Sequence, residues 1–246
     1  MEDQIISLTL ANIPVRLRLR HGFDRRRFEG FLTSAVPVDA PVISVSQAHL
    51  DACRALYPAE MSDILLEYNE LPGCISEYLL RRDCCVFHGV AFLWRGRAYL
   101  FTAPSGTGKS TQYVLWKEIL GDDMRIINGD KPILRLEQDG TIWVHPSPWQ
   151  GKEDMGRQEC GKLGGVILLE QGTENAVCPI SAAEAVVPLF LQFQFHAESE
   201  ESVRRVCQLE SRMLEQVPVW RMVNRGDTDS ARQCIHTIIR FEEDQK

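Results

Sequence analysis

One stretch in the middle of the chain constrains the fold more than any other. Residues 102–112 read T-A-P-S-G-T-G-K-S-T-Q. Apart from Ala103, which stands where a first glycine is usual, the stretch matches the Walker A pattern G-x-x-x-x-G-K-[ST]. Small residues let backbone N–H groups curl around an anion, and alanine is the next smallest residue after glycine. Such a loop needs a strand before it and a helix whose N-terminus faces the same anion.

Both flanks of the loop meet this requirement. Residues 98–102 form a short apolar run of strand type, and residues 110–120 have helical spacing that ends at Gly121. One face of this predicted helix is apolar and consists of Tyr113, Trp116 and Leu120. The context therefore favours a phosphate-binding loop over an ordinary glycine-rich turn.

Within the loop, each residue type has a chemical role. The residues expected to contact the phosphates of ATP are Ser105, Gly106, Thr107, Gly108, Lys109, Ser110 and Thr111. The Lys109 ammonium reaches toward the β and γ oxygens, and the Ser110 hydroxyl is a ligand for Mg²⁺. No N-K-x-D or L-S-G-G-Q segment occurs, which disfavours a GTPase switch and a transporter ATPase.

Composition narrows the class of partner. The chain has 246 residues and a net charge of −7, with 27 Lys+Arg against 34 Asp+Glu and no long basic block, so nucleic acid is not an expected partner. The start M-E-D-Q lacks a basic signal region, and no apolar run reaches membrane-spanning length, which predicts a cytoplasmic protein without membrane contact. The eight cysteines contain no C-x-x-C pair, so we expect small core residues and assign no metal site to them.

The region before the loop has two parts. Alternating residues 5–19 predict a half-buried hairpin whose arginines, Arg16, Arg18 and Arg20, form either a solvated face or a docking surface for an acidic partner. Residues 45–82 mix helical and irregular patterns, with breaks expected at Pro58, Pro72 and Gly73. We expect residues 1–82 to form an N-terminal β-hairpin and α+β region that packs on a nucleotide-binding domain of residues 83–246.

The remaining elements alternate between strands and helices. An apolar run from Cys84 to Leu93 turns at 94–97 into the strand before the loop, so an antiparallel hairpin feeds the loop. Ser181 and Glu184 form a capping box that opens a helix, which Pro188 must kink or end. The other predicted strands are 125–128, 141–144, 166–169 and 217–223, and the other predicted helices are 199–216 and a last one from about 228.

Three residues outside the loop are candidates for the chemistry. Asp130 ends the apolar strand R-I-I-N-G-D, and a simple βαβ crossover would bring its carboxylate to Ser110 as a second metal ligand; the alternative is a turn aspartate. His88 lies fifteen positions before Ala103, and contact with phosphate and a role as a core histidine are equally consistent with that position. Lys152, in S-P-W-Q-G-K-E, would contact phosphate or substrate, or belong to an ordinary surface loop.

Residues 86–110, V-F-H-G-V-A-F-L-W-R-G-R-A-Y-L-F-T-A-P-S-G-T-G-K-S, resemble part of the HPr kinase/phosphorylase catalytic domain and, more distantly, the P-loop of phosphoenolpyruvate carboxykinases. The resemblance covers about a tenth of the chain. It implies an α/β fold of the P-loop carboxykinase type, with mixed sheets, the antiparallel hairpin before the loop, and flanking helices. It also implies an ATP-dependent phosphotransferase that moves the γ-phosphoryl group to a serine-type hydroxyl of a small molecule, peptide or protein.

The resemblance assigns roles residue by residue. Lys109 contacts the nucleotide phosphates, Ser110 and Asp130 hold Mg²⁺, and Asp130 or His88 assists proton removal. Gly129 stands where the family has one aspartate of a pair, and no counterpart of the downstream phosphorolysis segment occurs. The alternative function is therefore a non-catalytic ATP-binding sensor. The acceptor, whether free serine, a peptide or a protein, and the oligomeric state are left open by the sequence.

Overall fold

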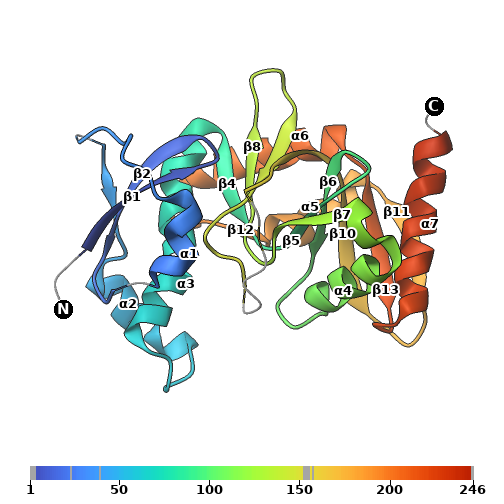
Figure 1. Ribbon diagram of the computed structural model, residues 1–246, viewed down its shortest axis with the longest axis horizontal. Helices are drawn as coiled ribbons and strands as arrows, with labels where there is room; N and C mark the ends of the chain where they lie inside the picture. The colour runs from blue at the N-terminus through green and yellow to red at the C-terminus, as the bar shows by residue number, and fades with distance from the viewer. Residues whose placement is uncertain (1–3, 23, 39, 152–155, 157, 245–246) are drawn as a thin grey trace.

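Two β-sheets organise the chain in a computed structural model that describes residues 4–22, 24–38, 40–151, 156 and 158–244 (Figure 1). A small sheet at the N-terminal end has three strands: β1 (Gln4–Leu10), β2 (Ile13–Leu19) and β3 (Val42–Ile43). A larger mixed sheet of ten strands occupies the rest of the molecule. The protein is thus a mixed α/β structure. Within the part of the chain described, no helix has both the length and the apolar character to cross a membrane.

The predicted N-terminal hairpin is confirmed. β1 and β2 pair antiparallel, and the turn between them consists of Ala11 and Asn12, which have positive φ values of 46° and 63°. Alternate side chains of the hairpin are buried, and the others face outward. On that outer side Arg16 donates to the Val38 carbonyl, and the Arg20 guanidinium donates to the Val45 carbonyl over 3.0 Å. Two of the three arginines therefore form hydrogen bonds with backbone carbonyls of the same chain.

Three helices follow the hairpin: α1 (Arg25–Phe28), α2 (Gln47–Cys53) and α3 (Asp63–Leu79). The predicted break at Pro72 and Gly73 is wrong, because α3 continues through both residues. Pro72 has no N–H for the carbonyl of Tyr68, four residues earlier. The Trp149 indole N–H donates to that carbonyl over 2.7 Å instead. A Cβ at Gly73 would lie 3.0 Å from the His196 ring, so a larger residue there would require that ring to shift.

The larger sheet is centred on the hairpin that precedes the loop. Its first elements are β4 (Cys84–Phe87), β5 (Val90–Trp94), β6 (Arg97–Thr102), α4 (Lys109–Leu120) and β7 (Met124–Asn128). The expected apolar run from Cys84 to Leu93 is divided in two at residues 88 and 89. A Cβ at Gly89 would lie 2.8 Å from the Phe101 carbonyl oxygen, so only glycine allows this close approach.

The crossover around α4 differs from the simple one predicted. β5 pairs antiparallel with both β6 and β7, so β6 and β7 run parallel with β5 between them. Helix α4 carries the chain across β5. The carboxyl ends of β6 and β7 still lie at the same edge of the sheet, because the two strands point the same way.

The second half of the chain completes the sheet and its covering helices. Its elements are β8 (Ile133–Leu136), β9 (Ile142–His145), β10 (Gly161–Gln171), β11 (Ala176–Ile180), α5 (Ala182–Phe190), β12 (Phe193–Gln194), α6 (Glu200–Gln216), β13 (Val219–Asn224) and α7 (Thr228–Asp244). The capping box of α5 is confirmed, and this helix ends two residues after Pro188. β10 is longer than predicted, and a Cβ at its Gly165 would lie 2.3 Å from the Trp220 ring.

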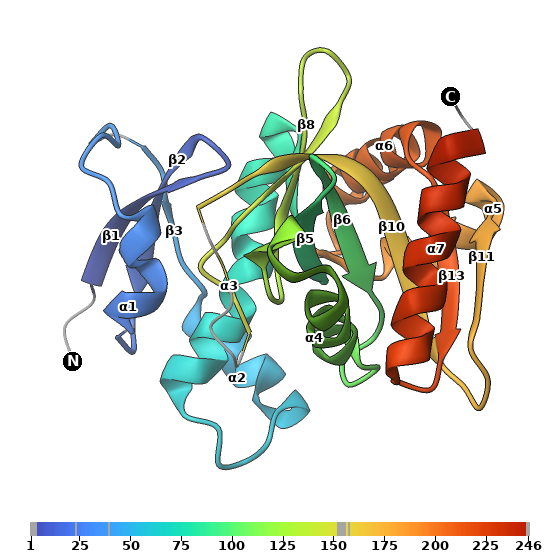
Figure 2. The same ribbon diagram turned by 45° about the vertical axis from the view of Figure 1, so that its right-hand side comes forward.

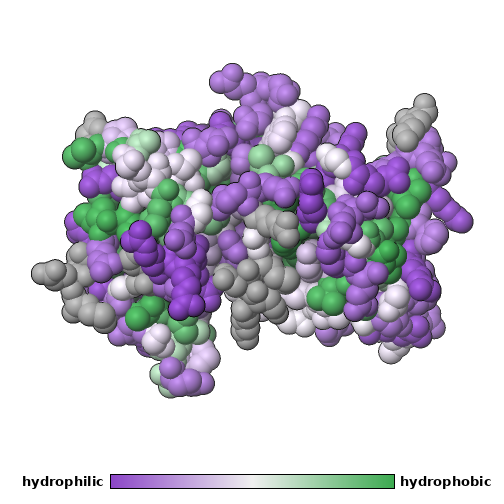
Figure 3. Space-filling model, in the orientation of Figure 1, coloured by the Kyte–Doolittle hydropathy of each residue, from purple (hydrophilic) through white to green (hydrophobic). Residues whose placement is uncertain are grey.

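Helices cover both faces of the larger sheet (Figure 2). Alternate residues of the strands point to opposite faces of the sheet and belong to two different apolar clusters. Phe92 and Ile167 belong to the cluster with Trp116 of α4 and Ile235 of α7. Leu93 belongs to the cluster with residues of α5 and α6. A third cluster joins the N-terminal hairpin and α3 to Cys84, Val86, Ile133 and Trp149. The face of the molecule shown in Figure 3 is mostly polar, and its apolar areas are small.

The bond between Trp149 and the Tyr68 carbonyl yields a stability prediction. We expect Trp149→Phe to lower the free energy of unfolding by roughly 1–3 kcal/mol, because it leaves a partly buried carbonyl without its donor. In a Pro72→Ala background the helix regains its own N–H at position 72, so the same substitution should cost less. Urea denaturation of the four proteins in this double-mutant cycle measures the coupling. An equal cost in both backgrounds would contradict this account of the helix.

Candidate functional site

The loop between β6 and α4 contains two glycines with left-handed backbone conformation. Gly106 and Gly108 have positive φ values of 81° and 101°, a backbone conformation that residues other than glycine rarely adopt. Ala103 is buried and is not among the non-glycine residues with positive φ in the described chain, so alanine is acceptable at the first position. The loop is exposed from Pro104 to Gly106, where a bound anion would have access to it.

Lys109 closes the loop on itself. Its ammonium donates to the carbonyl oxygens of Ala103 (2.8 Å) and Pro104 (3.1 Å), and the residue is 8% exposed. Burial lowers the pKa of Lys109 to about 8; the nearby charge of Lys131 lowers it further, whereas that of Asp130 raises it. The lysine therefore lies within electrostatic reach of Asp130.

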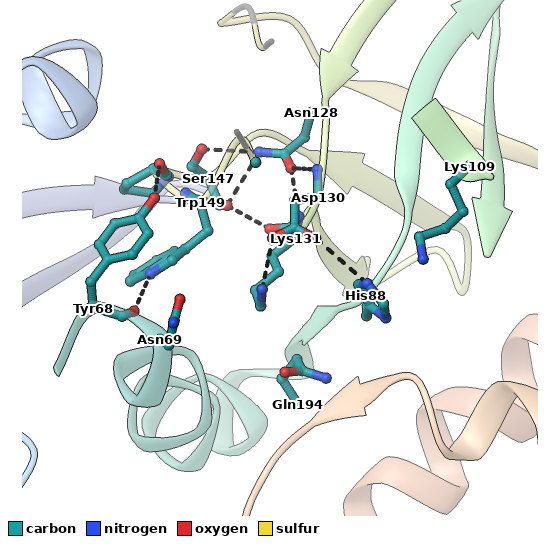
Figure 4. Close-up of polar contacts among 12 residues, drawn as sticks. Tyr68, Asn69, His88, Lys109, Asn128, Asp130, Lys131, Ser147, Trp149 and Gln194 are labelled. Carbon is teal, nitrogen blue, oxygen red and sulfur yellow. Dashed lines mark hydrogen bonds and ion pairs between the residues drawn. The ribbon is translucent and has the colours of Figure 1, made fainter. Parts of the chain in front are cut away.

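Asp130 lies between a histidine and a second lysine (Figure 4). Its Oδ1 is 3.5 Å from His88 Nε2, and its Oδ2 is 2.7 Å from Lys131 Nζ. The backbone joins the two segments as well, because the Gly89 N–H donates to the Asp130 carbonyl over 2.8 Å. The side chains of His88 and Asp130 retain 17% and 28% exposure, so a small reactant can reach both.

His88 is held as a neutral imidazole. Burial lowers its pKa to about 4, the charges of Lys109 and Lys131 act in the same direction, and Asp130 opposes them. Gln192 Nε2 donates to the Pro188 carbonyl (3.3 Å), and its Oε1 lies 3.1 Å from His88 Nδ1, so Nδ1 carries the proton. His88 Nε2 and Asp130 Oδ1 then both offer lone pairs to the same point. That arrangement suits a shared proton or a cation.

The turn after β7 is organised by Asn128 and not by the aspartate. Asn128 Oδ1 accepts from the backbone N–H groups of Asp130 (3.0 Å) and Lys131 (2.8 Å). Its Nδ2 donates to the Ser147 carbonyl over 3.0 Å, and Asn128 is fully buried. The turn role that was the alternative for Asp130 is thus filled by Asn128, which leaves the Asp130 carboxylate free to meet His88 and Lys131.

A buried polar network connects helix α4 to the end of β13 and to α7. Gln112 Nε2 donates to Asn224 Oδ1 (3.0 Å) at the end of β13 and to Ser230 Oγ (2.8 Å) on α7. Asn224 Nδ2 donates in turn to the Glu170 carbonyl over 3.0 Å. These contacts set the position of the helix N-terminus, and therefore of the loop, against the parallel part of the sheet.

The structure brings His88, Lys109 and Asp130 together. Ser110 and Thr111 lie in the first turn of α4, Ser105 is exposed, and Thr107 Oγ1 donates to the Pro104 carbonyl over 2.8 Å. His88 lies in the break between β4 and β5, where its carbonyl accepts from Thr102 Oγ1 (2.8 Å), rather than within a continuous strand. Lys152 lies outside the described residues. The roles of all these residues in binding or catalysis stay predictions.

Sequence reasoning missed three residues of this site. Lys131 directly follows Asp130, so its position next to the carboxylate was a usable signal. Asn128 begins the turn, and asparagine commonly bonds to the backbone two residues later. Gln192 is 104 positions from His88, and no local pattern marks it.

The comparisons with known proteins add little to this geometry. No protein-family model matches the chain, and no curated protein matches it. Among solved structures, the HPr(Ser) kinase/phosphatase from Coxiella burnetii aligns with 65% of this chain and 97% of its own, with 10% sequence identity and a TM-score of 0.36.

The neutral state of His88 has a consequence for stability. Its pKa of about 4 lies below the ordinary value of 6.5, so the unfolded chain binds the proton first on acidification. We expect the free energy of unfolding to rise with pH between about 4 and 6.5, and His88→Gln to reduce that rise. Burial also lowers the pKa of His145 to about 4, so a double variant with His145→Gln should lose more of it. Denaturation curves at several pH values test this, and an unchanged slope in His88→Gln would contradict it.

Proposed function

We propose that this protein is an ATP-dependent phosphotransferase that moves the γ-phosphoryl group of ATP to a serine-type hydroxyl. One observation carries the proposal: a loop with two left-handed glycines, closed by Lys109, lies within electrostatic reach of the Asp130–His88 pair. A phosphate-binding loop alone indicates nucleotide binding. A carboxylate and a neutral imidazole beside it supply what phosphoryl transfer further requires.

The residues present fit a nucleotide and its metal ion. The backbone N–H groups of residues 105–111 and the N-terminus of α4 would hold the phosphates, with Lys109 as the cation. When phosphate binds, the Lys109 ammonium would release the two loop carbonyls that it now contacts. It would then donate to charged phosphate oxygens instead of neutral acceptors. Ser110 and Asp130 would hold Mg²⁺, which when bound neutralises charge on the phosphate oxygens.

His88 and Asp130 would bind the acceptor hydroxyl and remove its proton. His88 is neutral, and its Nε2 lone pair is free to accept a proton from a hydroxyl group. Lys131 Nζ lies 2.7 Å from the second oxygen of Asp130 and forms an ion pair with it. We propose that Asp130 and His88 share the work that the missing second aspartate, at Gly129, would do in the resembling family.

The fold context supports the same proposal. An antiparallel hairpin, β5 and β6, precedes the loop as in the P-loop carboxykinase-like fold that residues 86–110 resemble. We further propose that residues 83–246 form the nucleotide-binding domain and that residues 1–82 pack on it through the cluster that contains Val86 and Trp149. The acceptor class remains a free hydroxy amino acid, a peptide or a protein.

A second candidate function is ATP sensing without transfer. Gly129 favours it, because the strand end then carries one carboxylate instead of two. A sensor would bind ATP through the same loop and show no turnover that depends on an acceptor.

Labelled ATP distinguishes the two functions. The purified protein is incubated with Mg²⁺, γ-labelled ATP and separate panels of free serine, serine peptides and HPr. We expect label transfer to at least one acceptor, and we expect Lys109→Ala to abolish it because the phosphates lose their cation. Tight ATP binding without transfer to any acceptor would favour the sensor and overturn the transferase.

The carboxylate is tested by a nearly isosteric change. Asp130→Asn should lower kcat by at least about 100-fold, the scale expected for a lost catalytic proton or charge contact. The fold should persist, because Asn128 and not Asp130 organises the turn. Lys117→Ala, on the far end of α4, serves as the matched control and should retain activity. A fully active Asp130→Asn protein with a normal circular dichroism spectrum would remove this residue from the mechanism.

A further inference from the structure

A second cluster of reactive side chains lies between α2 and α3, away from the nucleotide loop. His49 and Cys53 are four residues apart on α2, so they project from the same helical face. Glu70 faces them from α3, and its Oε2 is 2.7 Å from His49 Nε2. One ligand atom from each of the three residues lies within 4.8 Å of the others.

These three ligand types together favour one class of metal ion. Imidazole, thiolate and carboxylate together bind Zn²⁺ and related borderline-soft ions, whereas Mg²⁺ and Ca²⁺ prefer oxygen alone. Zinc–ligand bonds of about 2.0–2.3 Å place tetrahedral ligand atoms roughly 3.5 Å apart. The His49–Glu70 separation of 2.7 Å is shorter than this value, and every separation among the three ligand atoms is at most 4.8 Å, so small side-chain movements would bring the three ligands around one ion.

The surroundings already orient the carboxylate. Tyr57 OH donates to Glu70 Oε1 over 2.5 Å, which leaves Oε2 directed at His49. Partners of this kind, which fix the orientation of a ligand from behind, accompany most protein metal sites. The His196 ring lies beside the His49 ring, with their centroids 5.3 Å apart and their planes tilted by 41°.

Access and burial also suit a metal ion. Cys53 is 8% exposed and Glu70 retains 16% of its side-chain exposure, so the ion would be held away from bulk water. The His49 side chain is 36% exposed and leaves an entry path. The contact between His49 and Glu70 involves two of the three residues, and the Cys53 thiol, which makes a weak contact of 3.5 Å with the Leu50 carbonyl, also interacts with Glu70.

We propose that His49, Cys53 and Glu70 bind one Zn²⁺ ion, with water in the fourth position, and that the ion joins α2 to α3. Binding releases the thiol proton to solvent, because thiolate is the ligand form. The ion would stabilise the helix that carries Tyr68, whose carbonyl anchors Trp149 beside the Asn128 turn. The inference is independent of the phosphotransferase, since the two sites share no residue.

Cobalt is the probe that reports both geometry and sulfur ligation. The 246-residue chain, stripped of metal with a chelator, is titrated with Co²⁺ and then with Zn²⁺. We expect tetrahedral d–d absorption and a thiolate-to-cobalt charge-transfer band that saturate at one Co²⁺ per chain and disappear when Zn²⁺ is added. Cys53→Ser should abolish the charge-transfer band, and Glu70→Gln should weaken Zn²⁺ binding by at least about tenfold.

The control is a cysteine elsewhere on the protein. Cys207, exposed on α6, is replaced by serine, and the spectra should be unchanged. Zn²⁺ should raise the Tm of the wild type and of Cys207→Ser but not that of Cys53→Ser, a comparison that holds even if the last variant is less stable. Absence of the bands in the wild type, or bands that survive in Cys53→Ser, would overturn the proposal.

Discussion

The buried side chain of Asn128 is the contact on which the geometry of the site depends. One amide group accepts from two successive backbone N–H groups on one side and donates to the Ser147 carbonyl on the other. It therefore fixes the direction in which Asp130 and Lys131 leave β7, and it joins that turn to the segment that carries Trp149. Because the amide is buried, each of these bonds is difficult to replace with water.

The charged side chains of the site gather around this turn. Lys131 forms an ion pair with the carboxylate of Asp130, the charge of Asp130 also acts on Lys109, and the two lysines oppose protonation of His88. A neutral imidazole and an ionised carboxylate can thus coexist a few ångströms apart. Polyphosphate would enter a region of positive charge, and the proton acceptor would stay unprotonated, which are the two electrostatic requirements of transfer to a hydroxyl.

Helix α3 connects this centre to the N-terminal region. The proline within it frees a carbonyl, and Trp149 uses that carbonyl as its partner. Tyr68 OH also donates to the Pro148 carbonyl over 2.9 Å. A residue that usually breaks a helix here creates the acceptor that anchors the loop beside the candidate site. Position 149 is therefore set by a helix that begins more than eighty residues earlier.

The sequence by itself determined the local elements: the strand, loop and helix around Lys109, the N-terminal hairpin and the capping box at Ser181. Their signals lie within a few residues, in glycine conformation, apolar period and end caps, so no distant contact is needed to read them. The tertiary structure alone decided that β5 lies between β6 and β7, that α3 passes through Pro72, and that Gln192 meets His88. The last two outcomes depend on partners 81 and 104 positions apart, such as the Trp149 indole that replaces a helical donor, and chain-local patterns carry no information about which distant group will supply a missing bond.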